Sequence, residues 1–259
     1  MRIQEIISVI ENFAPLHWQE EFDNSGIQVG DVKQETTGVL LCVDLTESVL
    51  QEAISLNCNL IISHHPLLFH PLKKLTGQNY IERCVITACK NNIVIYAAHT
   101  NLDNAPSGVN FRLAEKIGLQ NIRILKPQNG QNYGSGAIGE LSEKVDEAVF
   151  LENLKTIFSA ENLQHSPFTG KKLKTVALCG GSGSFLIPDA ITAGADVFIT
   201  GEARFNHYYD VESQMLLAVL GHYETEQCTK EIFFDIISEK MPNFAVHFSK
   251  ANINPVNYR

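Results

Sequence analysis

Short apolar segments alternate with amphipathic segments along almost the whole chain, and this alternation restricts the fold more than any other feature. Apolar runs at residues 39–43, 60–62 and 93–97 are matched later by runs at residues 176–179, 197–199 and 216–220. Strands separated by helices form largely parallel sheets with helices on their faces, because parallel neighbours need a long crossover between them. We therefore predict an α/β fold.

The two parts of this pattern agree in detail, which predicts two similar α/β domains. Four identities recur at one constant offset, as an internal duplication would produce. Unrelated strand–helix–strand units also resemble one another because they obey the same packing rules, so independent packing remains an alternative. The matching residues are Cys42, Ala53, Ile54 and Ile62 in the first half and Cys179, Ala190, Ile191 and Ile199 in the second.

A polar stretch between the two patterns marks the predicted domain boundary. Residues 126–133 are rich in Pro, Gln, Asn and Gly and show no apolar period. We therefore assign residues 1–126 to a first domain and residues 127–259 to a second, and we allow the last apolar strand, residues 244–248, to return to the first.

Composition and charge exclude several classes of partner. A hydrophobic content of 44% in 259 residues is enough for a real core. The net charge of −9 argues against binding a nucleic-acid backbone and suits cation binding. No charge-free apolar run reaches the roughly 18 residues of a membrane span.

The six cysteines form no Cys-x-x-Cys and lie mostly in apolar segments, which predicts packing roles in a reducing, cytoplasmic compartment.

Polar residues suited to chemistry follow the predicted strands. The carboxyl ends of parallel strands share one edge of a sheet, and ligands collect there. One edge of each sheet is therefore expected to carry the functional site. The residues concerned are Asp44, His64, His65, His99, Asp103, Glu202, His222 and Glu226.

The types and spacing of these residues predict a metal site. Ser63 and Pro66 indicate that the strand has ended at His64-His65, so both rings can address neighbouring ions. His222 and Glu226 have the i, i+4 spacing that places two ligands on one helical face. Imidazole with carboxylate favours Zn, Mn, Fe or Ni, and a carboxylate can bridge two ions about 3.5–4 Å apart.

Other polar groups have two interpretations each. The loop of residues 180–184, Gly-Gly-Ser-Gly-Ser, either binds an anion through its backbone N–H groups or is a tight strand-to-helix turn. Glu202 and His207 either support the site or are ordinary surface groups, and Asp44 is similar.

Six segments spread through nearly the whole chain match one known family in order. They are Asp23-Asn24-Ser25-Gly26, Ser63-His64-His65-Pro66, His99-Thr100-Asn101-Leu102-Asp103, residues 176–183, Thr200-Gly201-Glu202 and residues 221–226. Through these segments the chain resembles the NIF3-like (DUF34) family, whose members are often named GTP cyclohydrolase 1 type 2 homologs.

The resemblance implies a dinuclear metal centre in the cleft between two similar domains, and a toroidal homohexamer. It implies that His65 and Asp103 bind one divalent ion, that His64 and His222 bind the other, and that Glu226 bridges both. His99 would lie beside the ions as a catalytic residue. The short span between residues 118 and 136 leaves no room for the inserted domain of longer members.

Two classes of function remain open on this basis. In the first, the protein is a metal-dependent hydrolase in which a bridging water attacks a nucleotide-like small molecule, as in a cyclohydrolase or phosphoesterase. In the second, it is a non-enzymatic metal-binding assembly that acts as a metal chaperone, a store or a regulatory partner.

Overall fold

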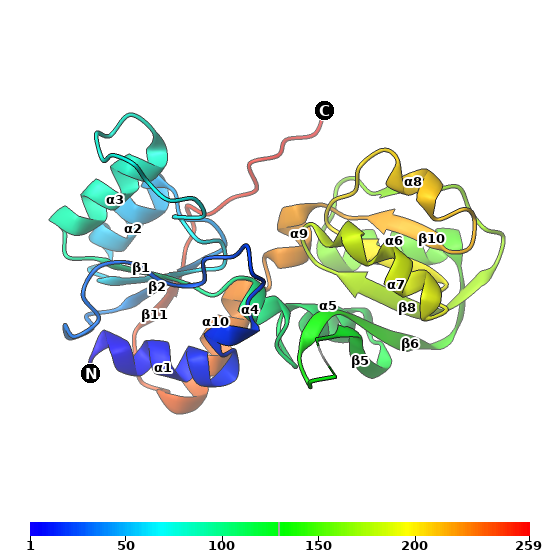
Figure 1. The fold of residues 1–259 in the computed structure, drawn as a ribbon, viewed down its shortest axis with the longest axis horizontal. Coiled ribbons are helices and arrows are strands. Elements are labelled where there is room, and N and C mark those ends of the chain that lie inside the picture. Colours follow the sequence, from blue (N-terminus) through cyan, green and yellow to red (C-terminus); the bar gives the residue numbers. More distant parts are fainter. Residues whose placement is uncertain (129) are drawn as a thin grey trace. The chain divides into compact units, whose positions relative to one another are not determined.

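The computed structural model describes residues 1–128 and 130–259, which divide into two compact units. The first unit comprises Met1–Leu102 and Thr229–Pro255, and the second comprises Asp103–Cys228 and Val256–Arg259. Each unit has its own sheet with helices packed on it (Figure 1). The predicted α/β class with two domains is confirmed.

The first unit is built on a five-stranded sheet of order β1-β4-β3-β2-β11. Four of its strands are parallel, and β1 is antiparallel to β4. Helices α2 and α3 cover one face and α1 and α10 the other (Figure 1). The bounds are α1 Ile3–Phe13, η1 Leu16–Trp18, β1 Gly26–Val29, β2 Val39–Cys42, α2 Glu47–Ser55, β3 Leu60–Ser63, α3 Tyr80–Lys90, β4 Val94–Ala97, α4 Thr100–Asp103, α10 Thr229–Lys240 and β11 Val246–Phe248.

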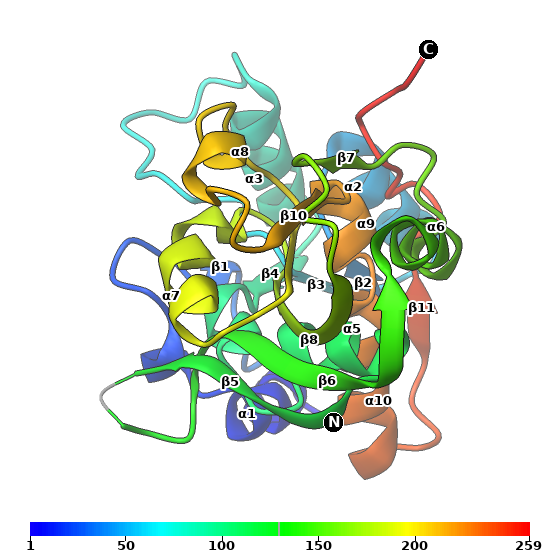
Figure 2. The same cartoon turned by 90° about the vertical axis from the view of Figure 1, so that its right-hand side faces the viewer.

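The second unit has a six-stranded mixed sheet of order β5-β6-β8-β9-β10-β7. Its centre, β8, β9 and β10, is parallel, whereas β5, β6 and β7 pair antiparallel with their neighbours. Helix α7 lies on one face and α5 and α6 lie on the other (Figure 2). The bounds are α5 Val109–Ile117, β5 Gln120–Pro127, β6 Gly134–Asp146, α6 Glu147–Phe158, β7 Gln164–His165, β8 Lys172–Cys179, η2 Gly183–Leu186, α7 Ile187–Thr192, β9 Val197–Thr200, α8 His207–Asp210, β10 Leu216–Val219 and α9 His222–Glu226.

The inner strands are uniformly apolar because both of their faces are covered. Every residue of β2, β4, β9 and β10 is buried, as parallel strands between two helical layers must be. Helix starts are set locally, since Thr46 and Asn79 accept hydrogen bonds from the backbone N–H groups of Val49 and Glu82 at the beginnings of α2 and α3. The strand ends that carry the site are therefore fixed to a rigid core.

The observed division of the chain differs from the predicted boundary between residues 126 and 127. That boundary falls inside β5, which pairs antiparallel with β6 through Arg123 and Ile138. Only Leu125 of β5 is buried, so the strand has no apolar period and resembles a loop in the sequence. The last strand, β11, pairs with β2 in the sheet of the first unit, opposite residues Val39 to Leu41.

The two units share one register. In the first, Val39 lies opposite Leu60 and Cys42 opposite Ser63. In the second, Val176 lies opposite Val197 and Cys179 opposite Thr200, and each of these positions is related to its counterpart by the offset that relates Cys42 to Cys179. Duplication predicts this agreement in register, whereas independent packing does not require it.

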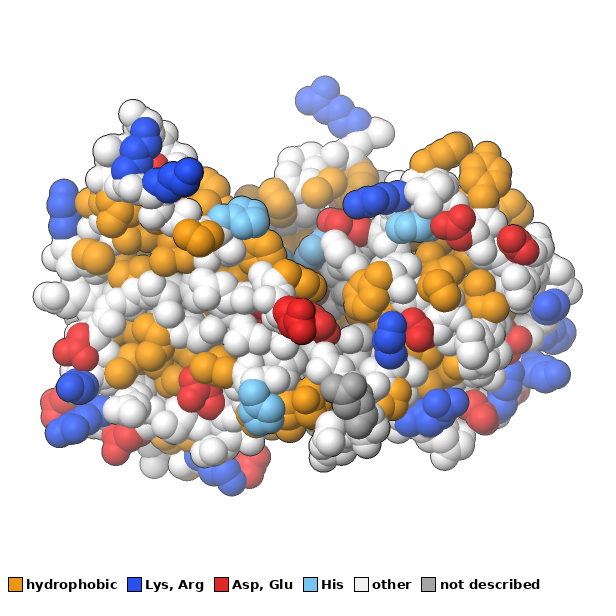
Figure 3. Space-filling model, in the orientation of Figure 1, with side chains coloured by type: hydrophobic (Ala, Val, Ile, Leu, Met, Phe, Trp, Pro, Cys, Tyr) orange, Lys and Arg blue, Asp and Glu red, His pale blue; other side chains and the backbone are white. Residues whose placement is uncertain are grey.

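The surface and the cysteines agree with the composition. On the face that Figure 3 shows, Lys and Arg side chains are interspersed with Asp and Glu rather than gathered into one basic patch. Among the described residues, no helix combines the length and the apolar character needed to cross a bilayer. Packing roles for most cysteines are confirmed, because five of the six are buried and only Cys89 is exposed.

Candidate metal centre

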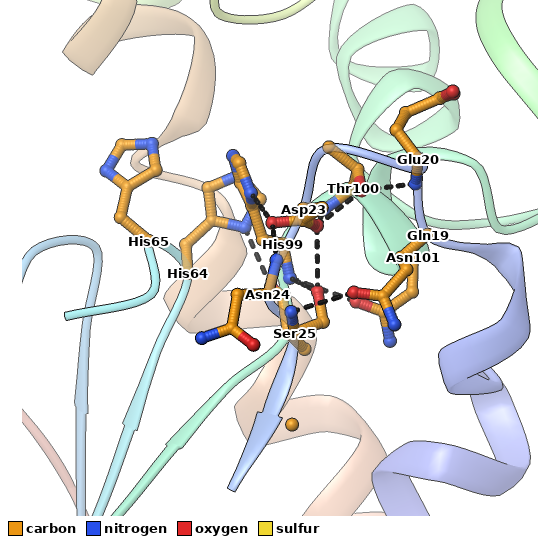
Figure 4. A network of polar contacts seen from close by, with 12 residues as sticks. Gln19, Glu20, Asp23, Asn24, Ser25, His64, His65, His99, Thr100 and Asn101 are labelled. Atoms are coloured by element: carbon orange, nitrogen blue, oxygen red, sulfur yellow. Dashed lines mark hydrogen bonds and ion pairs between the residues drawn. The ribbon is translucent and has the colours of Figure 1, made fainter. Parts of the chain in front are cut away.

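Three histidines meet at the carboxyl edge of the first unit's sheet. The register places the last residues of β2, β3 and β4 side by side, at Cys42, Ser63 and Ala97. The chain then delivers the rings of His64, His65 and His99 to the same edge, with centroids 5.0, 5.2 and 5.4 Å apart (Figure 4). Each offers a nitrogen within 4.8 Å of the others, so this group could hold a metal ion.

The three imidazoles are each oriented by an oxygen acceptor at Nδ1. His64 donates to the carbonyl of Ala98 at 2.9 Å, and His65 donates to Oδ1 of Asp44 at 2.7 Å. His99 donates to Oδ1 of Asp23, also at 2.7 Å. A proton on Nδ1 makes Nε2 the basic nitrogen, and metal-binding or proton-accepting histidines are typically held this way.

Asp23 is the centre of the polar network behind His99 (Figure 4). Its side chain is fully buried and accepts hydrogen bonds from Ser25 Oγ at 3.0 Å, from the Thr100 backbone N–H at 3.0 Å, and from the Thr100 hydroxyl. Burial alone would raise the pKa of Asp23, but the hydrogen bond and charge of His99, with the Thr100 hydroxyl, lower that pKa well below its usual range. Asp23 is therefore a carboxylate that orients His99.

The role of Asp23 was not predicted from the sequence. Its segment reads as a polar loop, and its partner lies 76 positions away. The antiparallel pairing of β1 with β4 supplies the missing information, because Gly26 lies opposite Ala97. Residues just before Gly26 must then run beside residues just after Ala97.

The second unit carries a histidine–carboxylate pair on the first turn after β10. His222 Nε2 lies 2.9 Å from Oε2 of Glu226, as their i, i+4 spacing predicts. Two ligands about 2 Å from one ion lie roughly 3 Å apart, so this pair fits a divalent ion. Glu226 is 4% exposed, which keeps its carboxylate away from bulk solvent.

Glu202 supports His222 from the end of β9. Its Oε1 accepts the Nδ1 proton of His222 at 2.8 Å, and its Oε2 accepts from Ser182 Oγ at 2.7 Å. Burial would raise the pKa of Glu202, but these two hydrogen bonds and the charge of His222 outweigh it, so the pKa is lowered. Of the two interpretations left open by the sequence, the contacts with His222 and Ser182 favour a supporting role over that of an ordinary surface group.

The glycine loop of residues 180–184 is a tight turn rather than an anion cradle. Three of its backbone N–H groups already donate to side chains, each at 3.0 Å. Gly181 has φ +57°, and a Cβ there would fall on Oε1 of Glu226 and lie 3.3 Å from Nε2 of His222. The loop thus packs directly against the pair in α9. The three donor–acceptor pairs are Gly180 to Asn110 Oδ1, Gly181 to Thr225 Oγ1 and Gly183 to Thr200 Oγ1.

The predicted site residues thus fall into two groups. His64 and His65 lie with His99 in the first unit, and His222 lies with Glu226 in the second. Asp103, the last residue of α4, begins the second unit, and its backbone carbonyl accepts from Asn110 Nδ2 at 3.0 Å. The donor chemistry of both groups fits divalent ions.

Comparison with known proteins identifies the family. The model of the Duf34/NIF3 (NGG1p interacting factor 3) family matches residues 1–255. The chain belongs to this family. The resemblance seen in the sequence is thereby confirmed for nearly the whole chain.

Individual relatives agree with this assignment. A GTP cyclohydrolase 1 type 2 homolog of Lactococcus lactis is 33% identical over 264 residues, covering 98% of each chain. A relative of the same name in Clostridium perfringens is 34% identical over 229 residues, covering 87% of each. The crystal structure of a Bacillus cereus protein related to NIF3 matches with a TM-score of 0.92 at 25% identity, covering 100% of this chain and 99% of that one.

We predict that Asp23→Asn destabilises the protein in a pH-dependent way. Because the folded-state pKa of Asp23 is lowered, its stabilising contribution is complete above the ordinary carboxyl pKa of about 3.9 and is lost as the pH falls through the lowered value. Urea unfolding should show a loss of about 1.5–3 kcal/mol at pH 5–7 that shrinks below about pH 4. The exposed Asp31→Asn variant serves as the control, and an equal, pH-independent loss in both would contradict the prediction.

We predict that Gly181→Ala distorts the His222–Glu226 pair. Gly194→Ala is a matched control, because Gly194 also has positive φ, +73°, but nothing lies within 4 Å of an added Cβ there. Both variants thus share the backbone strain of a positive φ, whereas only Gly181→Ala places a Cβ on the Glu226 carboxylate. Thermal unfolding should show a larger decrease in Tm for Gly181→Ala, by the equivalent of about 1–3 kcal/mol. Equal decreases would argue that the loop does not pack tightly on α9.

Proposed function

We propose that this protein binds two divalent metal ions and uses them as a hydrolase. One observation carries the proposal: four imidazoles, those of His64, His65, His99 and His222, each donate Nδ1–H to an oxygen acceptor. A carbonyl or carboxylate in that position fixes the ring and raises the basicity of Nε2. Histidines on the solvated surface can donate Nδ1–H to water, so a protein oxygen behind each of these four rings indicates that the rings are deliberately oriented.

We propose a ligand set that joins both groups of residues. His65 and Asp103 would bind one ion, His64 and His222 would bind the other, and Glu226 would contribute to both. Zn, Mn, Fe and Ni are the candidate ions, since neutral imidazole and carboxylate are borderline ligands and no cysteine belongs to the set. The i, i+4 geometry of His222 and Glu226 supports their sharing of an ion.

The hydrolase proposal rests on His99 as the catalytic residue. Two divalent ions at this site would supply Lewis-acid activation of a water nucleophile and of its target. His99, held by the buried carboxylate of Asp23, accepts a proton at Nε2 and returns it to the leaving group, as an imidazole oriented by a carboxylate does in other hydrolases. Names such as GTP cyclohydrolase 1 type 2 homolog support a nucleotide-like or phosphoester substrate.

A second function has support from the same site. The proposed ligands come from both compact units, so bound ions would also stabilise the folded chain. In that case the protein is a metal chaperone, a store or a regulatory partner without turnover.

We further propose that the protein forms a toroidal homohexamer in the cytoplasm. Light scattering tests the assembly, and a strictly monomeric species over a wide concentration range would disprove it.

We predict that Glu226→Gln loses both ions. A bridging carboxylate contributes to each ion, whereas the neutral amide has lost the charge that balances them. Metal analysis should give close to two ions per chain for the unaltered protein and close to none for the variant. The exposed Glu161→Gln variant should keep both ions; full occupancy in Glu226→Gln would disprove the bridging role.

We predict that His99→Ala keeps its metal but loses turnover by about 10²-fold or more, the usual contribution of a general acid or base. The measurement is a hydrolysis screen with nucleotides and phosphoesters in the presence of Zn, Mn, Fe or Ni, with metal content recorded in parallel. Loss of metal in His99→Ala would make it a ligand instead. A screen without turnover, together with a large decrease in Tm on chelation, would favour the non-enzymatic function over the hydrolase.

A further inference from the structure

A cavity in the second unit lies beside the residues that support His222. Its volume is about 670 Å³, within the range of roughly 300–1,000 Å³ typical of small-molecule sites. It opens at the carboxyl ends of β9 and β10, the edge at which α/β sheets bind ligands. The side chains that matter for recognition are Gln164, Ser182, Ser184, Phe185, Arg204 and His207.

The cavity is lined mainly by hydrogen-bond donors. The guanidinium of Arg204 makes no ion pair or hydrogen bond with any part of the chain that the structure describes, and neither does the Ser184 hydroxyl. His207 accepts the Arg204 backbone N–H at Nδ1, at 3.0 Å, so its ring proton is on Nε2 and can be donated. Gln164 accepts the Tyr208 hydroxyl at Oε1, at 2.8 Å, which leaves its amide NH₂ as the donor.

The lining also contains one carboxylate, that of Glu202, which keeps its negative charge. Its Oε1 accepts from His222 and its Oε2 from Ser182, so both oxygens already have hydrogen-bond donors. The groups left to contact a ligand are the Arg204 cation and several neutral donors, and these suit an anion. Arg204 can bind two oxygens of one phosphate in parallel, which a point charge does not.

Phe185 supplies the apolar wall. Its side chain is 57% exposed although it follows a tight turn and precedes α7, so its ring is not used in the core. An aromatic ring in a polar cavity provides a stacking surface for any flat heterocycle, with little preference among them. Donors on one side and an aromatic face on the other match a heterocycle that carries a phosphate.

We propose that this cavity binds the phosphate of a nucleotide-like small molecule through Arg204, His207, Ser184 and Gln164, with the ligand's ring against Phe185. That the ligand is the substrate of the metal centre rests on the proposed function. Binding itself does not depend on it, because all these residues lie within the second unit.

The experiment measures binding of adenosine 5′-monophosphate to the full-length metal-loaded protein by calorimetry, with adenosine and inorganic phosphate as comparison ligands. Arg204→Gln should weaken binding of the nucleotide by about 10-fold or more, and Arg204→Lys by less, because charge is kept and the paired hydrogen bonds are lost. The matched control is Arg123→Gln, which alters another exposed arginine of the same unit, on β5 outside the cavity.

The same titration with Glu226→Gln separates this site from the metal centre. The proposal holds if Arg204→Gln weakens binding without changing metal content or Tm, and if Glu226→Gln still binds the nucleotide. This outcome would support the cavity even if the metal assignment were wrong. If Glu226→Gln abolishes binding and Arg204→Gln does not, the phosphate binds the ions and the proposal is wrong. Adenosine binding as tightly as the nucleotide, phosphate alone binding as tightly, or no binding at millimolar concentration would also overturn it.

Discussion

The in-register parallel pairing of β2, β3 and β4 is the constraint on which the first unit's site depends. Because Cys42, Ser63 and Ala97 lie opposite one another, the three chains leave the sheet at one edge. The same holds for Cys179, Thr200 and Val219 in the second unit. A shift of register would carry a histidine away from its neighbours, and a shift by one residue would turn every side chain of the strand to the opposite face of the sheet.

A second condition is that each imidazole has an oxygen behind it, and the oxygens come from different places. Asp44 follows β2, Asp23 precedes β1, Ala98 follows β4 and Glu202 follows β9. The offset that relates Cys42 to Cys179 also relates His65 to Glu202. His65, a candidate ligand in the first unit, and Glu202, which orients the candidate ligand His222 in the second, thus occupy equivalent positions. Such a difference is expected if duplicated units have diverged.

Much of this could be predicted from the sequence, and the failures have physical causes. Buried parallel strands are continuous apolar runs, so β2, β3, β4, β8, β9 and β10 were recognisable, and the residues after them were found with them. Asp23 was not assigned because its role depends on an antiparallel partner far along the chain. Strand β5 was missed because edge strands lose the apolar pattern, and only Leu125 of this strand is buried.

Glu202 connects the two chemical features of the second unit. One of its oxygens holds Nδ1 of His222 and the other holds the hydroxyl of Ser182, a residue of the cavity wall. A ligand that draws the Ser182 hydroxyl away would leave Glu202 with a single donor and strengthen its bond to His222, because a carboxylate concentrates its charge on the partner that remains. Stronger acceptance at Nδ1 makes Nε2 more basic. A ligand that contacted Ser182 in this way would therefore couple occupancy of the cavity to the basicity of His222 Nε2 through the Glu202 carboxylate.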